Sequence, residues 1–116
     1  VGLALAVGCL LHGFAVPAIG VLVVGAVFGW QYSLPPLALA WRGVGEVDNA
    51  ALGGLVLPAY GFAVAAGTVT VDALLATVPF ATVVFLNLLD TTWPDRAADA
   101  AVGKRTLATR WPAGRL

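Results

Sequence analysis

The stretch VDALLATVPFATVVFLNLL, residues 71–89, decides the fold class of this chain. Between Ala73 and Leu89 it contains no Asp, Glu, Lys or Arg. The apolar core of a bilayer is about 30 Å thick and needs about 20 helical residues to cross it, so this run predicts a transmembrane helix. A strand of a transmembrane barrel would alternate apolar and polar residues, whereas this run is apolar on every side.

Ionisable residues are absent from two further stretches of the same kind. No Asp, Glu, Lys or Arg precedes Arg42, and none occurs from Asn49 to Val71. The 116 residues are 60% hydrophobic and 10% charged, against roughly 45–50% apolar residues in a soluble domain. This composition excludes an ordinary water-soluble globule, and the formal net charge of zero excludes the broad positive field of a nucleic-acid-binding protein.

The sequence therefore predicts an all-α protein, part of a polytopic transmembrane helical bundle. The expected spans are about 1–11, 14–32, 49–68 and 71–89, the first being the tail end of a helix that starts before Val1, with polar loops at 33–48 and 90–106. A short polar turn separates the last two spans, and there Asp72 is expected to cap the final helix. Small residues let helices approach closely in lipid, which favours Gly20, Gly25 and Gly29, or Ala59, Ala63 and Ala66, as contact stripes. Because the chain begins with Val and ends soon after a Trp-Pro pair, we expect it to be part of a longer membrane protein.

The cationic residues all fall on one side of this predicted topology. The positive-inside rule assigns that side to the cytoplasm, so both polar loops are expected to be cytoplasmic in a multi-pass protein of the cell membrane. The six residues are Arg42, Arg96, Lys104, Arg105, Arg110 and Arg115.

The second loop carries the residues best suited to bind a metal ion and a phosphate. Asp95 and Asp99 are four apart, so a helical turn after Pro94 would project both carboxylates from one face, where a bound cation would remove their repulsion. Hard oxygen ligands suit Mg²⁺ bridging to a substrate phosphate, and Lys104 and Arg105 add positive charge suited to a diphosphate. The alternatives are a solvated acidic loop and a basic anchor for lipid headgroups.

The first loop combines polar residues with residues that restrict or release the backbone. Two prolines follow Tyr32, and a pair of glycines flanks Val44 between Arg42 and Glu46. Prolines stiffen an extended segment, whereas glycines permit a tight turn that presents the Arg and Glu side chains together. The alternative is a connector on the membrane surface that contains an Arg–Glu pair.

Two strings of residues in these loops resemble motifs of the UbiA superfamily of intramembrane prenyltransferases. Asp95-xxx-Asp99-xxx-Gly103-Lys-Arg-Thr-Leu107 is similar to the family's second aspartate-rich motif. Tyr32-Ser-x-Pro-Pro, followed by Leu39-x-x-Arg42-Gly-x-Gly-Glu46, resembles the branch that prenylates 1,4-dihydroxy-2-naphthoate for menaquinone. The resemblance covers essentially the whole chain. It implies a helical bundle of about nine spans, of which this chain would supply the middle, with the first aspartate-rich motif before Val1.

The resemblance implies Mg²⁺-dependent transfer of a polyprenyl group from its diphosphate to an aromatic quinone precursor. The implied catalytic residues are Asp95, Asp99, Lys104 and Arg105, with Asp95, Asp99 and Asp90 as metal ligands. The implied substrate-binding residues are Arg42, Tyr32, Glu46 and Asn87. Asn87 and Asp90 belong to a stretch, Asn87-Leu-Leu-Asp90, that departs from the family pattern. With half of the metal site outside it, the chain alone is expected to be inactive.

Two alternatives to this function stay open at the level of sequence. Another member of the same family could use a different acceptor: 4-hydroxybenzoate, a haem or chlorophyll precursor, or a glycerol lipid. The chain could instead be a non-catalytic membrane segment or part of a transporter. A transporter more often shows ionisable or helix-breaking residues at the middle of the membrane, and here only Pro58 and Pro79 qualify.

Overall fold

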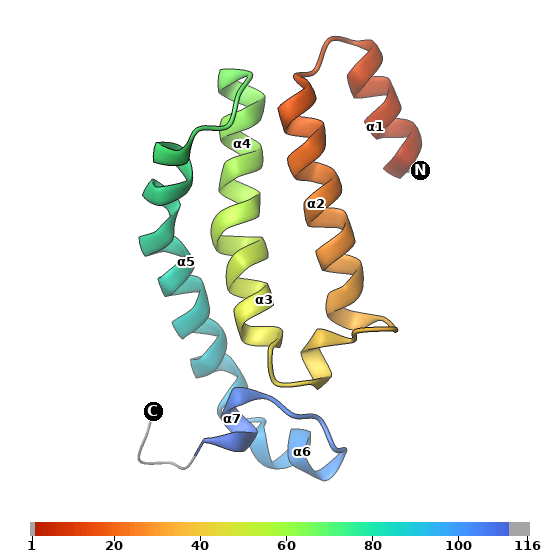
Figure 1. Ribbon diagram of the computed structural model, residues 1–116. Coiled ribbons are helices and arrows are strands. Elements are labelled where there is room, and N and C mark those ends of the chain that lie inside the picture. Colours follow the sequence, from red (N-terminus) through yellow and green to blue (C-terminus); the bar gives the residue numbers. More distant parts are fainter. Residues whose placement is uncertain (1, 112–116) are drawn as a thin grey trace.

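The computed structural model describes residues 2–111, and the regular elements within this range are all helical (Figure 1). Three long helical rods run side by side: α2 (Val16–Ser33), a continuous rod built from α3 (Gly45–Ala51), a π-helical turn η2 (Leu52–Val56) and α4 (Leu57–Ala66), and α5 (Val71–Thr92). The shorter elements are α1 (Gly2–Leu11), η1 (Leu39–Trp41), α6 (Arg96–Ala101) and α7 (Leu107–Arg110). The expected all-α class is confirmed.

The three rods are long and apolar enough to cross a membrane. The two longest have 22 residues each, or about 33 Å at about 1.5 Å per residue. Their large apolar side chains point outward, so that Leu57, Val71 and Val83 are each at least 60% exposed. Such surfaces suit contact with lipid rather than water, and the chain is a membrane protein.

The helix bounds differ from the expected ones at the polar ends. The second rod begins at Gly45 rather than near residue 49, and α5 continues to Thr92 rather than ending near residue 89. Glu46 and Asp48 lie in the first turn of α3, where negative charge is compatible with the helix dipole. The hydroxyl of Thr92, the last residue of α5, donates to the Leu88 carbonyl, 2.8 Å away. The 33–48 and 90–106 loops are therefore shorter than predicted.

The connection between α4 and α5 is a tight turn of four residues. Gly67 ends α4 with φ 71°, a left-handed conformation that glycine adopts without a steric penalty. The Thr70 hydroxyl then caps α5 by accepting the Ala73 N–H at 3.2 Å. The prediction that Asp72 is the cap is wrong, because Asp72 already lies inside the first helical turn.

Small residues set the spacing between the second rod and α5. A Cβ built on Gly54 would lie 2.2 Å from the Cα of Ala81, so the two backbones come together at this position. On the other side of the rod, a Cβ on Gly25 would lie 3.1 Å from the Val56 side chain.

Of the stripes expected from the sequence, Ala59 and Ala63 are buried and Ala66 is exposed. A Cβ on Gly20 or Gly29 would meet open space.

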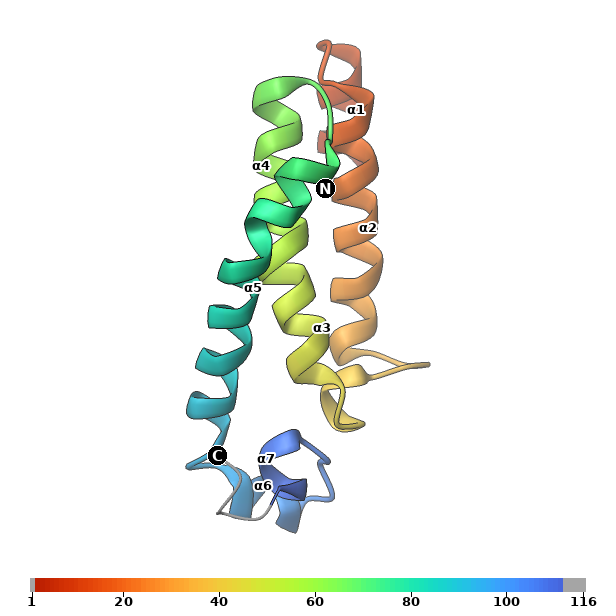
Figure 2. The ribbon, with the colours of Figure 1, turned by 60° about the vertical axis from the view of Figure 1, so that its left-hand side comes forward.

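The polar segments gather at one end of the bundle. The α1–α2 and α4–α5 connections lie at the end opposite to η1, α6 and α7 (Figures 1 and 2). The cations within residues 2–111 belong to the η1, α6 and α7 end, as the topology predicts; Arg115 lies outside the described residues.

We predict that Gly54→Ala destabilises the protein, because the new methyl group would overlap the Ala81 backbone. Overpacking of this kind costs about 1–3 kcal/mol. Gly61→Ala is the matched control, since Gly61 lies on the same rod and its Cβ would meet no atom within 4 Å. Thermal unfolding in detergent should show a lower Tm for Gly54→Ala only, and equal Tm values for the two variants would contradict the close approach.

Candidate functional site

The two polar loops meet through three hydrogen bonds. The Arg105 N–H donates to the Trp41 carbonyl at 3.2 Å, and the Leu107 N–H donates to Glu46 Oε1 at 2.8 Å. The Arg110 guanidinium donates to the Arg42 carbonyl, also at 3.2 Å. These bonds join the segment around η1 to the start and end of α7. The two regions that carry the family resemblance thus form one structural unit.

Glu46 is the buried centre of this unit. It is 2% exposed, and its carboxylate accepts the N–H of the first residue of α7. The first N–H groups of a helix have no partner within the helix, so this bond satisfies one of them. Thr106 is the N-cap residue of the same helix. Its hydroxyl accepts the Thr109 N–H, and the Thr109 hydroxyl accepts the Thr106 N–H. The sequence placed Glu46 among the substrate-binding residues, whereas its carboxylate here binds the protein backbone.

Asp95 and Asp99 lie one helical turn apart. The Asp99 N–H donates to the Asp95 carbonyl at 2.8 Å, which gives the turn expected after Pro94. Asp95 is exposed and Asp99 is half-buried. Lys104 reaches back over Gly103 (φ 77°) and donates to both carboxylate oxygens of Asp99, at 3.0 and 3.2 Å. This is the one salt bridge among the residues that the structure describes.

The acidic turn offers two carboxylates, without a complete metal-binding group among the described residues. Proteins often bind Mg²⁺ through one or two carboxylates, with substrate phosphates and water completing the shell. Asp95 and Asp99 fit that donor set. Within residues 2–111 no three His, Cys, Asp or Glu side chains come together around a metal position. Asp90, the third expected ligand, is exposed on α5 and does not complete such a group.

A basic pocket of about 360 Å³ lies beside the acidic turn. It is lined by Ala100, Gly103, Lys104, Arg105, Thr109 and Arg110. Three cations facing one cavity suit an anion with several oxygen atoms. The sequence had selected Lys104 and Arg105 for this role but not Arg110. A helix beginning at Leu107 brings Arg110 back to the pocket, and the capping threonine that precedes it was the available signal.

Arg110 also explains the glycine at position 43. The backbone of Gly43 has φ 77°, and a Cβ there would lie 2.6 Å from the Arg110 guanidinium carbon. A side chain at this position would therefore displace Arg110 from the contact between the loops.

The other expected substrate-binding residues are more dispersed. The Arg42 guanidinium donates to the Pro36 carbonyl at 2.9 Å and so holds its own loop. Tyr32 is half-buried near the end of α2, and Asn87 is exposed on α5. Across the described range, no hydrogen bond joins the side chains of Tyr32, Asn87 or Asp90 to the acidic turn.

Comparison with known proteins gives no relative on which to base a function. No family model matches the chain, and no curated protein or solved structure matches it significantly.

We predict that Glu46→Ala loosens α7, because the half-buried Leu107 N–H would lose its partner. Leaving such a group unsatisfied costs about 1–3 kcal/mol. Hydrogen exchange measured by mass spectrometry should become faster across residues 105–110, while the middle of α5 stays protected. Glu46→Gln keeps an acceptor oxygen and should restore most of the protection; exchange as fast as in the alanine variant would show that the contact does not hold α7.

Proposed function

We propose that this chain belongs to an intramembrane enzyme that transfers a polyprenyl group from polyprenyl diphosphate to an aromatic acceptor. The preferred acceptor is 1,4-dihydroxy-2-naphthoate, as in menaquinone biosynthesis. The main support for the proposal is that the two UbiA-like motifs contact each other. Segments 61 to 68 residues apart in the sequence are joined by hydrogen bonds from α7 to Glu46 and Arg42. This union supports a shared role for the two motifs.

The proposed reaction begins with heterolysis of the allylic carbon–oxygen bond. The electron pair leaves with the diphosphate, and positive charge develops on the prenyl carbon. The aromatic carbon of the acceptor attacks that carbon and forms the new bond; for the naphthoate, the family resemblance implies that the ring then loses its carboxylate as carbon dioxide. The protein must therefore stabilise the negative charge that accumulates on the leaving group.

In this proposal the three cations that line the basic pocket perform that task. Arg105 and Arg110 bind phosphate oxygens through their guanidinium groups, which suit this geometry better than a point charge does. Lys104 lies between the pocket and Asp99, so its ammonium group adds charge beside the same oxygens. The backbone bonds at Trp41 and Glu46 hold the segment that carries these cations.

The acidic turn supplies the metal ligands of the proposed site. Asp95 and Asp99 would hold Mg²⁺, which neutralises charge on the departing diphosphate. Further carboxylates would come from the first aspartate-rich motif, which the resemblance places before Val1.

The membrane setting suits both substrates. A polyprenyl tail is insoluble in water and is accommodated beside apolar helices, whereas the diphosphate needs polar groups at the membrane surface. The three long helices and the polar end of the bundle provide these two environments. By the positive-inside rule we place the polar end in the cytoplasm.

The assay that tests this function uses membranes containing the full-length protein. Radiolabelled polyprenyl diphosphate is offered with 1,4-dihydroxy-2-naphthoate or with 4-hydroxybenzoate, with and without Mg²⁺. We expect Mg²⁺-dependent label in the prenylated naphthalene product. Label only on 4-hydroxybenzoate would change the acceptor, and no transfer to either would refute the proposed reaction with these acceptors.

We predict that Asp95→Ala or Asp99→Ala abolishes transfer, because each removes a metal-binding carboxylate. Membrane insertion and expression should stay normal, since neither side chain packs between the long helices. Asp72→Asn is the control, as Asp72 is an exposed acid at the opposite end of the bundle. Turnover at the wild-type rate in both alanine variants would refute the metal assignment.

We predict that Arg105→Gln raises KM for the prenyl diphosphate by about tenfold or more, since a hydrogen bond to a charged group contributes about 1.5–3 kcal/mol. The KM for the aromatic acceptor should change little. The substitution keeps the backbone N–H that bonds Trp41. Steady-state kinetics with each substrate varied separately provides the test, and an effect confined to the acceptor would place Arg105 elsewhere in the site.

A further inference from the structure

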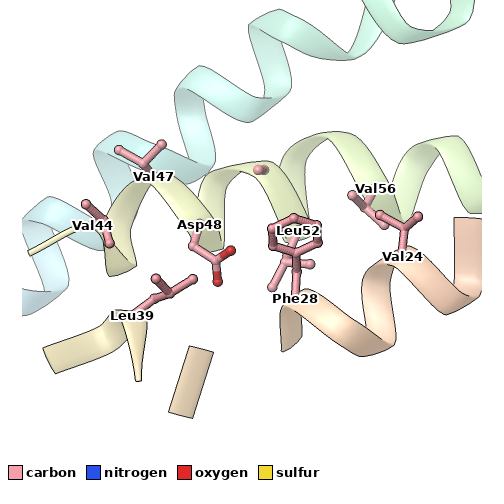
Figure 3. Close-up of a pocket in the computed structure, with 9 residues that line it drawn as sticks. Val24, Phe28, Leu39, Val44, Val47, Asp48, Leu52 and Val56 are labelled. Carbon is pink, nitrogen blue, oxygen red and sulfur yellow. The ribbon is translucent and has the colours of Figure 1, made fainter. Parts of the chain in front are cut away.

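An apolar groove of about 360 Å³ lies between α2 and the second rod (Figure 3). Small-molecule sites usually have volumes of about 300–1,000 Å³ and combine apolar walls with a few polar groups. Val24 and Phe28 of α2 form one wall, and Leu52 and Val56 of the rod face them. The lining residues cover about one turn of α2 and more than two turns of the second rod.

Asp48 is the one polar side chain among the nine residues that line this groove. Its Oδ2 atom is buried and has no hydrogen-bond partner among the residues described. A buried carboxylate oxygen without a partner is costly, and such atoms in folded proteins usually have a ligand, an ion or water to satisfy them. Figure 3 shows the carboxylate between Leu39 and Leu52, directed away from its own helix.

The surroundings of Asp48 indicate which kind of donor it can accept. An ammonium group carries three donors and a guanidinium five, whereas a hydroxyl carries one. A groove with a single polar side chain can satisfy the hydroxyl but leaves most donors of a cation without partners. The apolar walls, which include the Phe28 ring, suit a flat aromatic body.

We propose that this groove binds the hydroxylated aromatic ring of the acceptor, with a phenolic hydroxyl donating to Asp48 and the acceptor's own carboxylate outside the apolar walls, at the end that Leu39 and Val44 line. The proposal rests on the proposed function and assigns its acceptor to a groove whose one polar residue, Asp48, lies outside the family-like motifs. Asp48 is then a residue that positions the ring and selects for its hydroxyl group.

The position of the groove relative to the basic pocket is consistent with two substrates. Leu39 and Val44 line one end of the groove. The segment between them makes the hydrogen bonds to Arg105 and Arg110, which line the basic pocket. A single short segment therefore borders both the acceptor groove and the diphosphate pocket.

Equilibrium binding of two matched probes tests the proposal without any prenyl transfer. The full-length protein in lipid nanodiscs is titrated with tritiated 1-naphthol or 1-methoxynaphthalene, and binding to empty nanodiscs is subtracted. The two probes share the aromatic body, but only 1-naphthol can donate a hydrogen bond. A bond to a charged acceptor should favour 1-naphthol by about tenfold or more in the wild type.

Three variants identify the source of that preference. Asp48→Ala should abolish it by weakening 1-naphthol alone, and Asp48→Asn, which keeps a neutral acceptor oxygen, should reduce it. Asp72→Asn should keep the wild-type preference. Unchanged binding of 1-methoxynaphthalene in the Asp48 variants would show that the groove is intact.

Several results would overturn the proposal. These are equal affinities for the two probes in the wild type, a preference that survives in Asp48→Ala, or loss of both probes in Asp48→Asn, which would give Asp48 a structural role only. Tighter binding of 1-naphthylmethylammonium than of 1-naphthol would assign the groove to a cation. The binding test contains no diphosphate, so it is independent of the prenyl-transfer assay. A probe preference combined with no transfer in that assay would refute the enzyme function alone. Transfer combined with no probe preference would refute the acceptor groove alone.

Discussion

The close approach of Gly54 to Ala81 determines how the rest of this structure can be arranged. In lipid, helices gain little from burying apolar side chains against one another, so packing depends on how closely their backbones can approach. The missing side chain at Gly54 brings the second rod and α5 together. The π-helical turn around it accommodates Pro58, whose nitrogen cannot donate to the preceding turn. With these two helices fixed, the loops at their polar ends are placed side by side.

The sequence predicted the apolar helices and the placement of charge well, because both depend on composition along the chain. Lipid-facing helices show long runs without charge, and the absence of charged residues from 73 to 89 identified α5 directly. The ends of the helices were less predictable. A Glu or Asp can lie just before the start of a helix or in its first turn. Only the packing of α3 against its neighbours shows that Glu46 and Asp48 belong to the helix.

The candidate site was predictable in its residue types but not in its contacts. The spacing of Asp95 and Asp99 indicated a shared helical face, and the adjacent Lys104 and Arg105 indicated an anion site. The backbone pairing of Arg105 with Trp41 leaves no mark in the sequence, because any residue can supply an N–H or a carbonyl. The same is true of Arg110, whose position depends on where α7 begins.

Glu46 and Asp48 show how two acidic residues on one short helix can have different hydrogen-bonding partners. At about 100° of rotation per residue, side chains two positions apart point about 160° away from each other, to nearly opposite faces of the helix. Glu46 therefore faces α7, where a free N–H satisfies it, and Asp48 faces the apolar groove, where the described chain offers no donor. A carboxylate thus either completes the fold or stays available to a ligand, according to its position on the helix.

The loop contacts also impose an order on biogenesis. Glu46 and Leu107 are 61 residues apart, so the first loop is synthesised about 3–12 s before its partner at about 5–20 residues per second. Two further helices long enough to span the bilayer are synthesised during that interval, and the Leu107 N–H that Glu46 accepts does not yet exist. The contacts at the polar end of the bundle can therefore form only after both of these helices have been synthesised.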